Sequence, residues 1–364
     1  MKSRVWKGLF YLLLLPAAIA FSGWQGWSWW SWATDPVEPF SAAESSSEGL
    51  TSSVQIEIPL GTSSQQIGRD LEAAGVIRSS TAWDLWTRWQ LFRQPEGGYQ
   101  AGTYVLSPAQ SLQDIANILW SGDVVTRSFT IPEGWNREQI ASALAAEGFF
   151  TAEEFLQLTE TIPVERYPWL PEQIPHVEGF LFPDTYQIPA EQVTPEAIMF
   201  LMLDRFENTA LPIYQAQAPA MELLDWVTLA SIVEKEAVIP EERSLIAGVF
   251  SNRLAAGIPL GADPTVEYGL GIRQTPENPL TLSQVQTPNA YNTYLNAGLP
   301  PTPIANPGLA SLEASLNPAE TDYLYFVARY DGTHVFSRTL QEHEAAQAQI
   351  RDEIDRPEDS PSTN

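Results

Sequence analysis

An internal repeat constrains the fold of this 364-residue chain more than any other feature. A segment from Ile58-Pro59 to Gly75 recurs 73 residues later, from Ile131-Pro132 to Gly148. Each copy predicts a strand, a glycine turn and an amphipathic helix that ends at a glycine. A looser match follows, because Thr103-Tyr104 and Thr185-Tyr186 each precede a further helical pattern. The chain therefore contains two related units rich in strand–helix pairs.

The N-terminus predicts a membrane anchor. Basic residues at positions 2, 4 and 7 precede an apolar run that has no charge up to Trp32 and carries five tryptophans near its far end. A helix that spans a membrane needs about 20 apolar residues, and the basic flank places the N-terminus in the cytoplasm. The competing interpretation is a signal peptide cleaved after Ala20. Because the run continues past Ala20, we favour an uncleaved transmembrane helix, and both interpretations export the rest of the chain.

Composition excludes several classes of function. Acidic residues outnumber basic ones 45 to 19, which gives a net charge of −26 and argues against nucleic acid as a partner. Cysteine is absent, which excludes disulfides, a thiol nucleophile and cysteine-bound zinc. The three histidines lack the spacing of a metal site, and no GxSxG motif is present. We expect neither a metal nor another cofactor.

The predicted organisation is an α+β protein with five parts. They are a membrane anchor (1–33), a flexible linker rich in Ser, Glu and Pro (34–53), a small module (54–127), a catalytic domain (128–349) and a disordered tail (350–364). Within the catalytic domain, a helix over 241–256 is predicted to stop at Gly257, and Asp331-Gly332 predicts a hairpin turn.

The segment from Thr228 to Ala237 holds the candidate acid. At about 100° per residue, its helix places a set of apolar side chains on one stripe. These are Leu223, Trp226, Val227, Ala230, Val233 and Ala237. Glu234 falls inside the stripe, whereas Glu236 lies on another face and ranks below it. A sheltered carboxyl has a raised pKa and suits general acid catalysis, although a Glu that bonds a neighbouring group is the alternative.

A series of strings then follows in one order along the chain. They are Glu178–Tyr186, Ala230–Glu236, Val249–Leu254, Asp263–Gly269, Thr287–Tyr294, Gly298–Pro301, Ile304–Gly308 and Tyr323–Val327. Together they resemble the YceG-like family of endolytic murein transglycosylases. The first module, 54–127, is similar to the small LysM-like module of that family, for which glycan binding and a mere spacer role both stay open.

The resemblance implies an activity. Glu234 would protonate the glycosidic oxygen between MurNAc and GlcNAc in nascent peptidoglycan and then accept the proton of the MurNAc C6 hydroxyl. The product would end in 1,6-anhydro-MurNAc, which would terminate glycan elongation. The implied partners are peptidoglycan strands, the membrane and wall-synthesis enzymes. The implied location is the bacterial plasma membrane, crossed once, with the catalytic domain on the cell-wall side.

The resemblance also carries a set of substrate-binding candidates. They are Glu178, Asp184, Asn252, Asp263, Thr265, Tyr268, Tyr291, Asn292 and Tyr294. Adjacent Gly179 and Pro183 predict a loop for the first two, and the turn-rich passage 258–265 predicts a loop at Asp263. Aromatic rings beside amides suit a pyranose, whereas turn capping and ordinary loop packing are the alternatives.

Two other functions stay open at this stage. One is a non-catalytic scaffold that binds cell-wall glycan while another enzyme cuts it. The other is a retaining glycoside hydrolase that pairs Glu234 with Glu178 or Asp263, which requires carboxyl groups about 5 Å apart.

Overall fold

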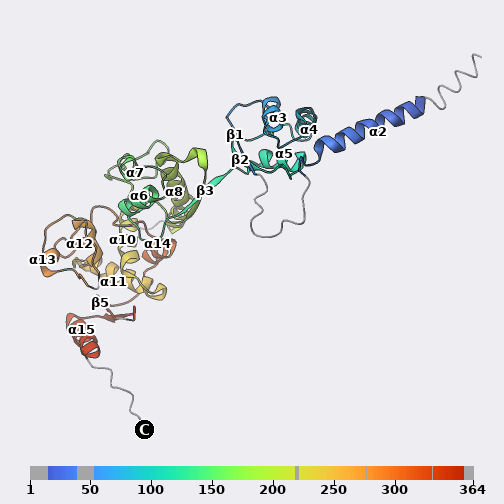
Figure 1. Cartoon of the computed structure of the whole chain (residues 1–364). Coiled ribbons are helices and arrows are strands. Elements are labelled where there is room, and N and C mark those ends of the chain that lie inside the picture. Colours follow the sequence, from blue (N-terminus) through green and yellow to red (C-terminus); the bar gives the residue numbers. More distant parts are fainter. Residues whose placement is uncertain (1–14, 39–52, 218–220, 276, 330, 356–364) are drawn as a thin grey trace, which may run out of the picture. The chain divides into compact units, whose positions relative to one another are not determined.

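The computed structural model describes residues 15–38, 53–217, 221–275, 277–329 and 331–355. These residues belong to two compact units (Figure 1). The first comprises Met1–Arg127 with Gln187–Gln192, and the second comprises Ser128–Tyr186 with Val193–Asn364. Helices and two-stranded sheets occur in both parts of the chain, which confirms the predicted α+β class.

The first unit is a small sheet covered by helices. Strands β1 (Val54–Ile58) and β2 (Gly102–Leu106) pair antiparallel, with Val54 opposite Leu106. Helices α3 (Ser64–Ala73), α4 (Ser80–Arg93) and α5 (Leu112–Ser121) supply most of its core, in which Trp83 is fully buried. This core contains residues of the first unit alone.

Helix α2 (Leu15–Thr34) reaches this unit at its C-terminal end. Ala33 is fully buried in the core, and Arg78 donates a hydrogen bond to the carbonyl of Trp32 at 3.1 Å. The backbone N–H of Glu38 donates to Pro108, so the start of the predicted linker packs on the first unit. Among the described residues, no helix combines the length and apolar character that a membrane span requires. Residues 1–14 and 39–52, parts of the predicted anchor and linker, lie outside the description.

The second unit begins with the second copy of the repeat. Helix α6 (Arg137–Ala146) begins and ends 73 residues after α3, and Gly75 and Gly148 adopt the same left-handed conformation with φ of 72°. Strands β3 (Thr126–Thr130) and β4 (Thr185–Pro189) form a second two-stranded sheet, and the boundary between the units falls within both strands. The predicted repeat is therefore confirmed.

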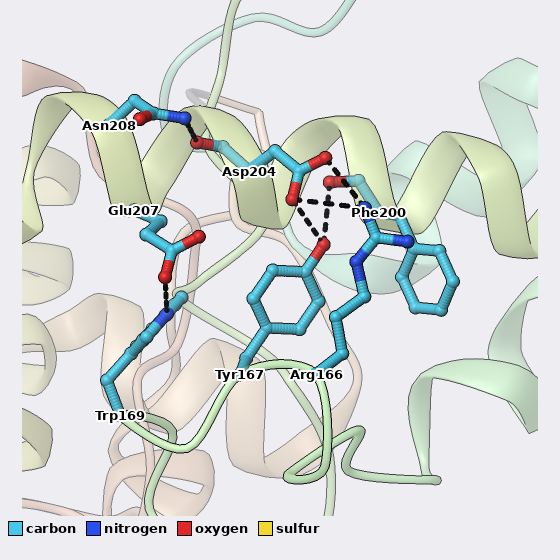
Figure 2. A network of polar contacts seen from close by, with 7 residues as sticks. All are labelled: Arg166, Tyr167, Trp169, Phe200, Asp204, Glu207 and Asn208. Carbon is cyan, nitrogen blue, oxygen red and sulfur yellow. Dashed lines mark hydrogen bonds and ion pairs between the residues drawn. The ribbon is translucent and has the colours of Figure 1, made fainter.

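A polar network fastens the loop before Leu170 to helix α8 (Pro195–Thr209), as Figure 2 shows. Asp204 accepts a hydrogen bond from the Tyr167 hydroxyl at 2.6 Å and forms an ion pair with Arg166 at 3.1 Å. One turn further along, Glu207 accepts the indole N–H of Trp169 at 2.9 Å. The aromatic side chains of this loop thus cover one face of α8.

The remaining elements complete the second unit. They are α7 (Ala152–Thr159), the 3₁₀ turn Pro240–Glu242, α9 (Leu211–Gln217), α10 (Leu223–Glu236), α11 (Arg243–Ala256), α12 (Asp263–Leu270), α13 (Leu282–Val285), α14 (Leu309–Leu316), β5 (Tyr325–Ala328), β6 (His334–Ser337) and α15 (Leu340–Asp355). A further 3₁₀ turn, Ala190–Gln192, belongs to the first unit. The predicted stop at Gly257 and the hairpin at Asp331-Gly332 are confirmed.

Three expectations need correction. Helix α10 has no single buried stripe, because every residue from Trp226 to Val233 is buried among neighbouring elements. Asp263 begins a helix and does not lie in a loop, because Pro264 suits the first turn of a helix. Helix α15 continues to Asp355 through the start of the predicted tail, since Ile350 is buried against the unit.

Candidate active site

The last turn of α10 directs three consecutive side chains to three different places. Successive residues of a helix point about 100° apart, and Glu234, Lys235 and Glu236 are the first residues beyond the fully buried part of α10. Glu234 reaches the start of α14, Lys235 reaches Gly134, and Glu236 lines a groove. The tertiary surroundings therefore distinguish two carboxyls that are separated by one residue.

Glu236 lies in a groove of about 540 Å³, which we call the acid groove. Its wall includes Arg253, Asp263, Tyr294 and Tyr325. Arg253 is held by hydrogen bonds to the carbonyls of Pro259 and Leu260, and its guanidinium lies 5.0 Å from the centre of the Tyr325 ring. A groove of this size, with aromatic faces beside polar groups, suits a sugar ring.

The electrostatics of the groove favour a protonated Glu236. Burial raises the pKa of this carboxyl to about 8, and the negative charges of Asp263 and Glu267 act in the same direction. The positive charge of Arg253 opposes them. Asp263 accepts the Tyr294 hydroxyl at 2.6 Å. Glu236 is thus an acid with its proton still bound near neutral pH, beside a second, hydrogen-bonded carboxylate.

Glu234 is held at the N-terminus of α14. Its Oε2 accepts the backbone N–H of Gly308 at 3.2 Å, and Gly308 is the residue that caps this helix. Burial raises the pKa of Glu234 too, but the helix N-terminus favours its charged form. Glu234 is not among the residues that line the acid groove.

Glu178 is a buried carboxyl with its oxygens fully engaged by protein groups. It accepts the backbone N–H of Arg137, the Tyr268 hydroxyl at 3.2 Å and the Asn306 amide at 2.8 Å. Burial raises its pKa to about 7. The Asn306 Oδ1 accepts the N–H of Gly179 at 2.9 Å. This network joins the loop at Glu178, the start of α6 and the segment before α14.

The other predicted binding residues have one of two roles, and Asn252 has both. Those that line cavities are Asp263 and Tyr294 in the acid groove, Tyr268 and Tyr291 in a second cavity lined by Lys235, and Asn252 in a third. Those that brace the chain are Asn252, Thr265, Asn292 and Asp184. Asn252 donates to Thr321 and Tyr323, Thr265 bonds Thr293, and Asn292 donates to Val285 and Thr287. Asp184 pairs with Arg205 at 2.6 Å on the predicted loop.

Sequence reasoning missed Asn306 and Glu267. Asn306 is fully buried and bonds both Glu178 and the backbone of its loop. The only signal in the sequence was its place between Ala305 and Pro307 in one of the matching strings. Within the described residues, no cluster of His, Asp and Glu is arranged to hold a metal ion.

Comparison with known proteins gives consistent matches. The profile of the YceG-like family matches residues 56–349. An endolytic murein transglycosylase of Bacillus subtilis is 34% identical over 80% of this chain and 83% of its own length. Another, from Streptococcus pneumoniae strain D39, is 32% identical over 80% of this chain and 57% of its own length. The crystal structure of a yceG-like protein from Listeria monocytogenes matches with a TM-score of 0.56 at 33% identity, over 81% of this chain and 99% of that one.

Proposed function

Because the chain belongs to the YceG-like family, we propose that it is an endolytic murein transglycosylase, which cuts peptidoglycan strands between MurNAc and GlcNAc. One observation supports this proposal: the carboxyl of Glu236 lies in a groove lined by aromatic and polar side chains, and burial raises the pKa of this carboxyl to about 8. A protonated carboxyl at neutral pH is what cleavage of a glycosidic bond requires.

In the proposed reaction, Glu236 gives its proton to the glycosidic oxygen as the bond from MurNAc C1 to that oxygen breaks. The C6 hydroxyl of the same MurNAc attacks C1, and the Glu236 carboxylate accepts the hydroxyl proton. The products are a free GlcNAc hydroxyl and a 1,6-anhydro-MurNAc end, with no water consumed. The nucleophile belongs to the sugar itself, so the site needs to position one hydroxyl and exclude water.

Glu234, which the helical pattern predicts as the acid, stays the alternative, and a matched pair of variants separates the two. We expect Glu236→Gln to lower turnover about 10³-fold, the typical contribution of a general acid. Glu234→Gln keeps its turnover within about tenfold, because it loses only a charged contact to a helix terminus. The reverse order of losses would assign the acid to Glu234.

Product analysis tests the activity. Purified full-length protein is incubated with peptidoglycan strands, and the new ends are weighed by mass spectrometry. Anhydro ends in the interior of strands support endolytic transglycosylation. Ends heavier by one water indicate a hydrolase, and polymer binding without new ends indicates the scaffold function.

We further propose that residues 1–33 anchor the protein in the bacterial plasma membrane, with the second unit on the cell-wall side, where chain cutting would end glycan elongation. The support is the basic flank before the apolar, tryptophan-rich run. Extraction of membranes with carbonate is expected to leave the full chain in the pellet and to release a chain without residues 1–33. Release of both would exclude the anchor.

A LysM-like role for residues 54–127 is also a proposal, supported by the resemblance of this segment to the small module of the family. Co-sedimentation with peptidoglycan tests it. Removal of the module is expected to weaken sedimentation of Glu236→Gln protein, and unchanged sedimentation would leave a spacer role. The same assay with purified wall-synthesis enzymes tests whether they bind this chain.

A further inference from the structure

A second cavity, which we call the basic cavity, lies next to the acid groove along the chain. It has a volume of about 460 Å³, and its wall includes Arg137, His176, Lys235, Tyr268 and Arg273. In two pairs of adjacent residues, one residue lines the basic cavity and the other lines the acid groove. Lys235 and Pro264 line the basic cavity, whereas the neighbouring Glu236 and Asp263 line the acid groove. At both places in the chain, consecutive residues therefore line the two hollows.

The basic cavity carries an excess of positive charge in a chain of net charge −26. Three of its wall residues are Lys or Arg, against two carboxylates, Glu138 and Glu267. Burial lowers the pKa of Lys235, and the nearby positive charge of Arg273 lowers it further. Within the described residues, neither Lys235 nor Arg273 forms an ion pair, and Lys235 donates only to the Gly134 carbonyl at 3.3 Å. The negative charges of Glu267 and Glu234 raise the pKa of Lys235, yet the three cations of the wall outnumber its two carboxylates, and this excess favours a bound anion.

Two buried polar atoms of wall residues point to the same conclusion. The Arg137 Nε and the His176 Nδ1 are both shielded from solvent without a hydrogen-bond partner among the described residues. A buried polar atom without a partner costs about 1–3 kcal/mol, so both wall residues would gain from a further polar group that reaches these atoms.

We propose that the basic cavity binds carboxylates of the peptide stem that MurNAc carries, an inference that rests on the proposed cleavage of peptidoglycan. The stem leaves MurNAc at C3, through the lactyl group of the sugar whose C1 is cut at Glu236. It therefore needs space close to the acid groove, and its free carboxylates need cationic partners. Lys235 and Arg273 supply the charge, while the rings of Tyr268 and Tyr291, 4.9 Å apart, supply an apolar wall.

The test compares two substrates that differ only in the charge of the stem. One is native peptidoglycan strands. The other is the same strands after conversion of their carboxylates to amides with carbodiimide and ammonium. The proteins are wild type, the double variant Lys235→Gln/Arg273→Gln, and the control Arg88→Gln, which removes an exposed cation of α4 that lines neither the acid groove nor the basic cavity.

We expect amidation to lower kcat/KM of wild type and of the control about tenfold, the effect of one lost charge-assisted contact. The double variant is expected to cut native strands about tenfold more slowly than wild type and to be indifferent to amidation. Equal sensitivity of wild type and double variant to amidation would overturn the proposal. So would wild type that is insensitive to amidation.

Binding supplies a readout that does not depend on turnover. The Glu236→Gln protein is titrated with short muramyl-peptide oligomers, native or amidated, by calorimetry. We expect amidation to weaken binding about tenfold, and the addition of Lys235→Gln/Arg273→Gln to abolish that difference. If wild type makes no anhydro ends but amidation still weakens binding, the proposed reaction is wrong and the stem-binding role of the basic cavity stands. If wild type makes anhydro ends but amidation does not change binding, the reaction stands and the stem-binding role is wrong.

Discussion

At the scale of single residues, the pKa of each carboxyl in the site depends on how strongly the carboxyl is desolvated and on which polar groups compensate for the lost water. Glu178 is enclosed but accepts several hydrogen bonds, whereas Glu236 lies among two other acids with one arginine opposite. Glu234 has a helix terminus as its partner. Of these three carboxyls, only Glu236 combines a raised pKa with a place in the wall of the acid groove.

The pH profile reports this environment. Because Glu236 must be protonated to act, we expect kcat/KM to fall as pH rises through about 8. Asp263→Asn removes a negative charge that raises the pKa of Glu236, so the decline moves to lower pH. The control Asp352→Asn, on the exposed face of α15, leaves the profile unchanged. A decline at the same pH in Asp263→Asn would contradict this assignment.

Stability is expected to depend on the same proton. The pKa of Glu236 is raised in the folded state from 4.5 to about 8, so the folded state holds this proton more tightly than the unfolded chain does. Stability is therefore lost as pH rises from about 4.5 to about 8. Glu236→Gln keeps the shape without the charge, and its advantage over wild type in urea unfolding should grow across this interval. An advantage that stays constant across this interval would place Glu236 in solvent.

The Asn306 side chain is expected to matter for folding more than for chemistry. Asn306→Ala leaves the N–H groups of Gly179 and Leu181 and the Glu178 carboxyl without their partner. The expected loss is about 3 kcal/mol of unfolding free energy, against less than about 0.5 kcal/mol for the exposed Asn208→Ala on α8. Urea titration measures both. Equal losses would mean that the network is solvated.

At the scale of elements, glycines determine how closely segments approach. Gly179 has φ of 89°, and a Cβ there would lie 2.4 Å from Pro303 and 2.9 Å from Val227. Gly148 has φ of 72° with open space around it. The loop of Glu178 can therefore pack on α10 only without a side chain at position 179, whereas the turn after α6 needs glycine for its backbone alone.

This contrast separates strain from steric clash. Gly148→Ala is expected to cost about 1 kcal/mol, the price of a left-handed alanine. Gly179→Ala adds overpacking against Pro303 and should cost more than about 3 kcal/mol. Urea unfolding of the second unit measures both. Similar costs for the two variants would show that the loop moves away from α10 without loss.

At the scale of the whole molecule, the two units have separate hydrophobic cores. The core of the first unit extends from Ala33 to Leu119, and a core cluster of the second extends from Leu229 to Ala314. The repeat places equivalent helices, α3 and α6, in the two units, and the acid groove lies in the second unit.

Separate cores predict separate unfolding. Leu71 is fully buried in the first core, and Leu71→Ala is expected to remove about 3 kcal/mol from that unit. Scanning calorimetry should resolve two transitions and show a lower Tm for one of them alone. A shift of both transitions, or one shared transition, would mean that the units unfold cooperatively.

The sequence by itself determined the repeat, the main helices with their glycine stops and the hairpin, because these follow from local periodicity and backbone preference. It also carried the family strings. It did not predict α12 as a helix, and its helical pattern ranked Glu234 above Glu236 as the candidate acid. Helix α10 is surrounded on all sides from Trp226 to Val233, so its apolar period says nothing about which carboxyl meets a groove. That choice depends on α14 and the segment at Asp263, whose positions are set only when distant parts of the chain pack together.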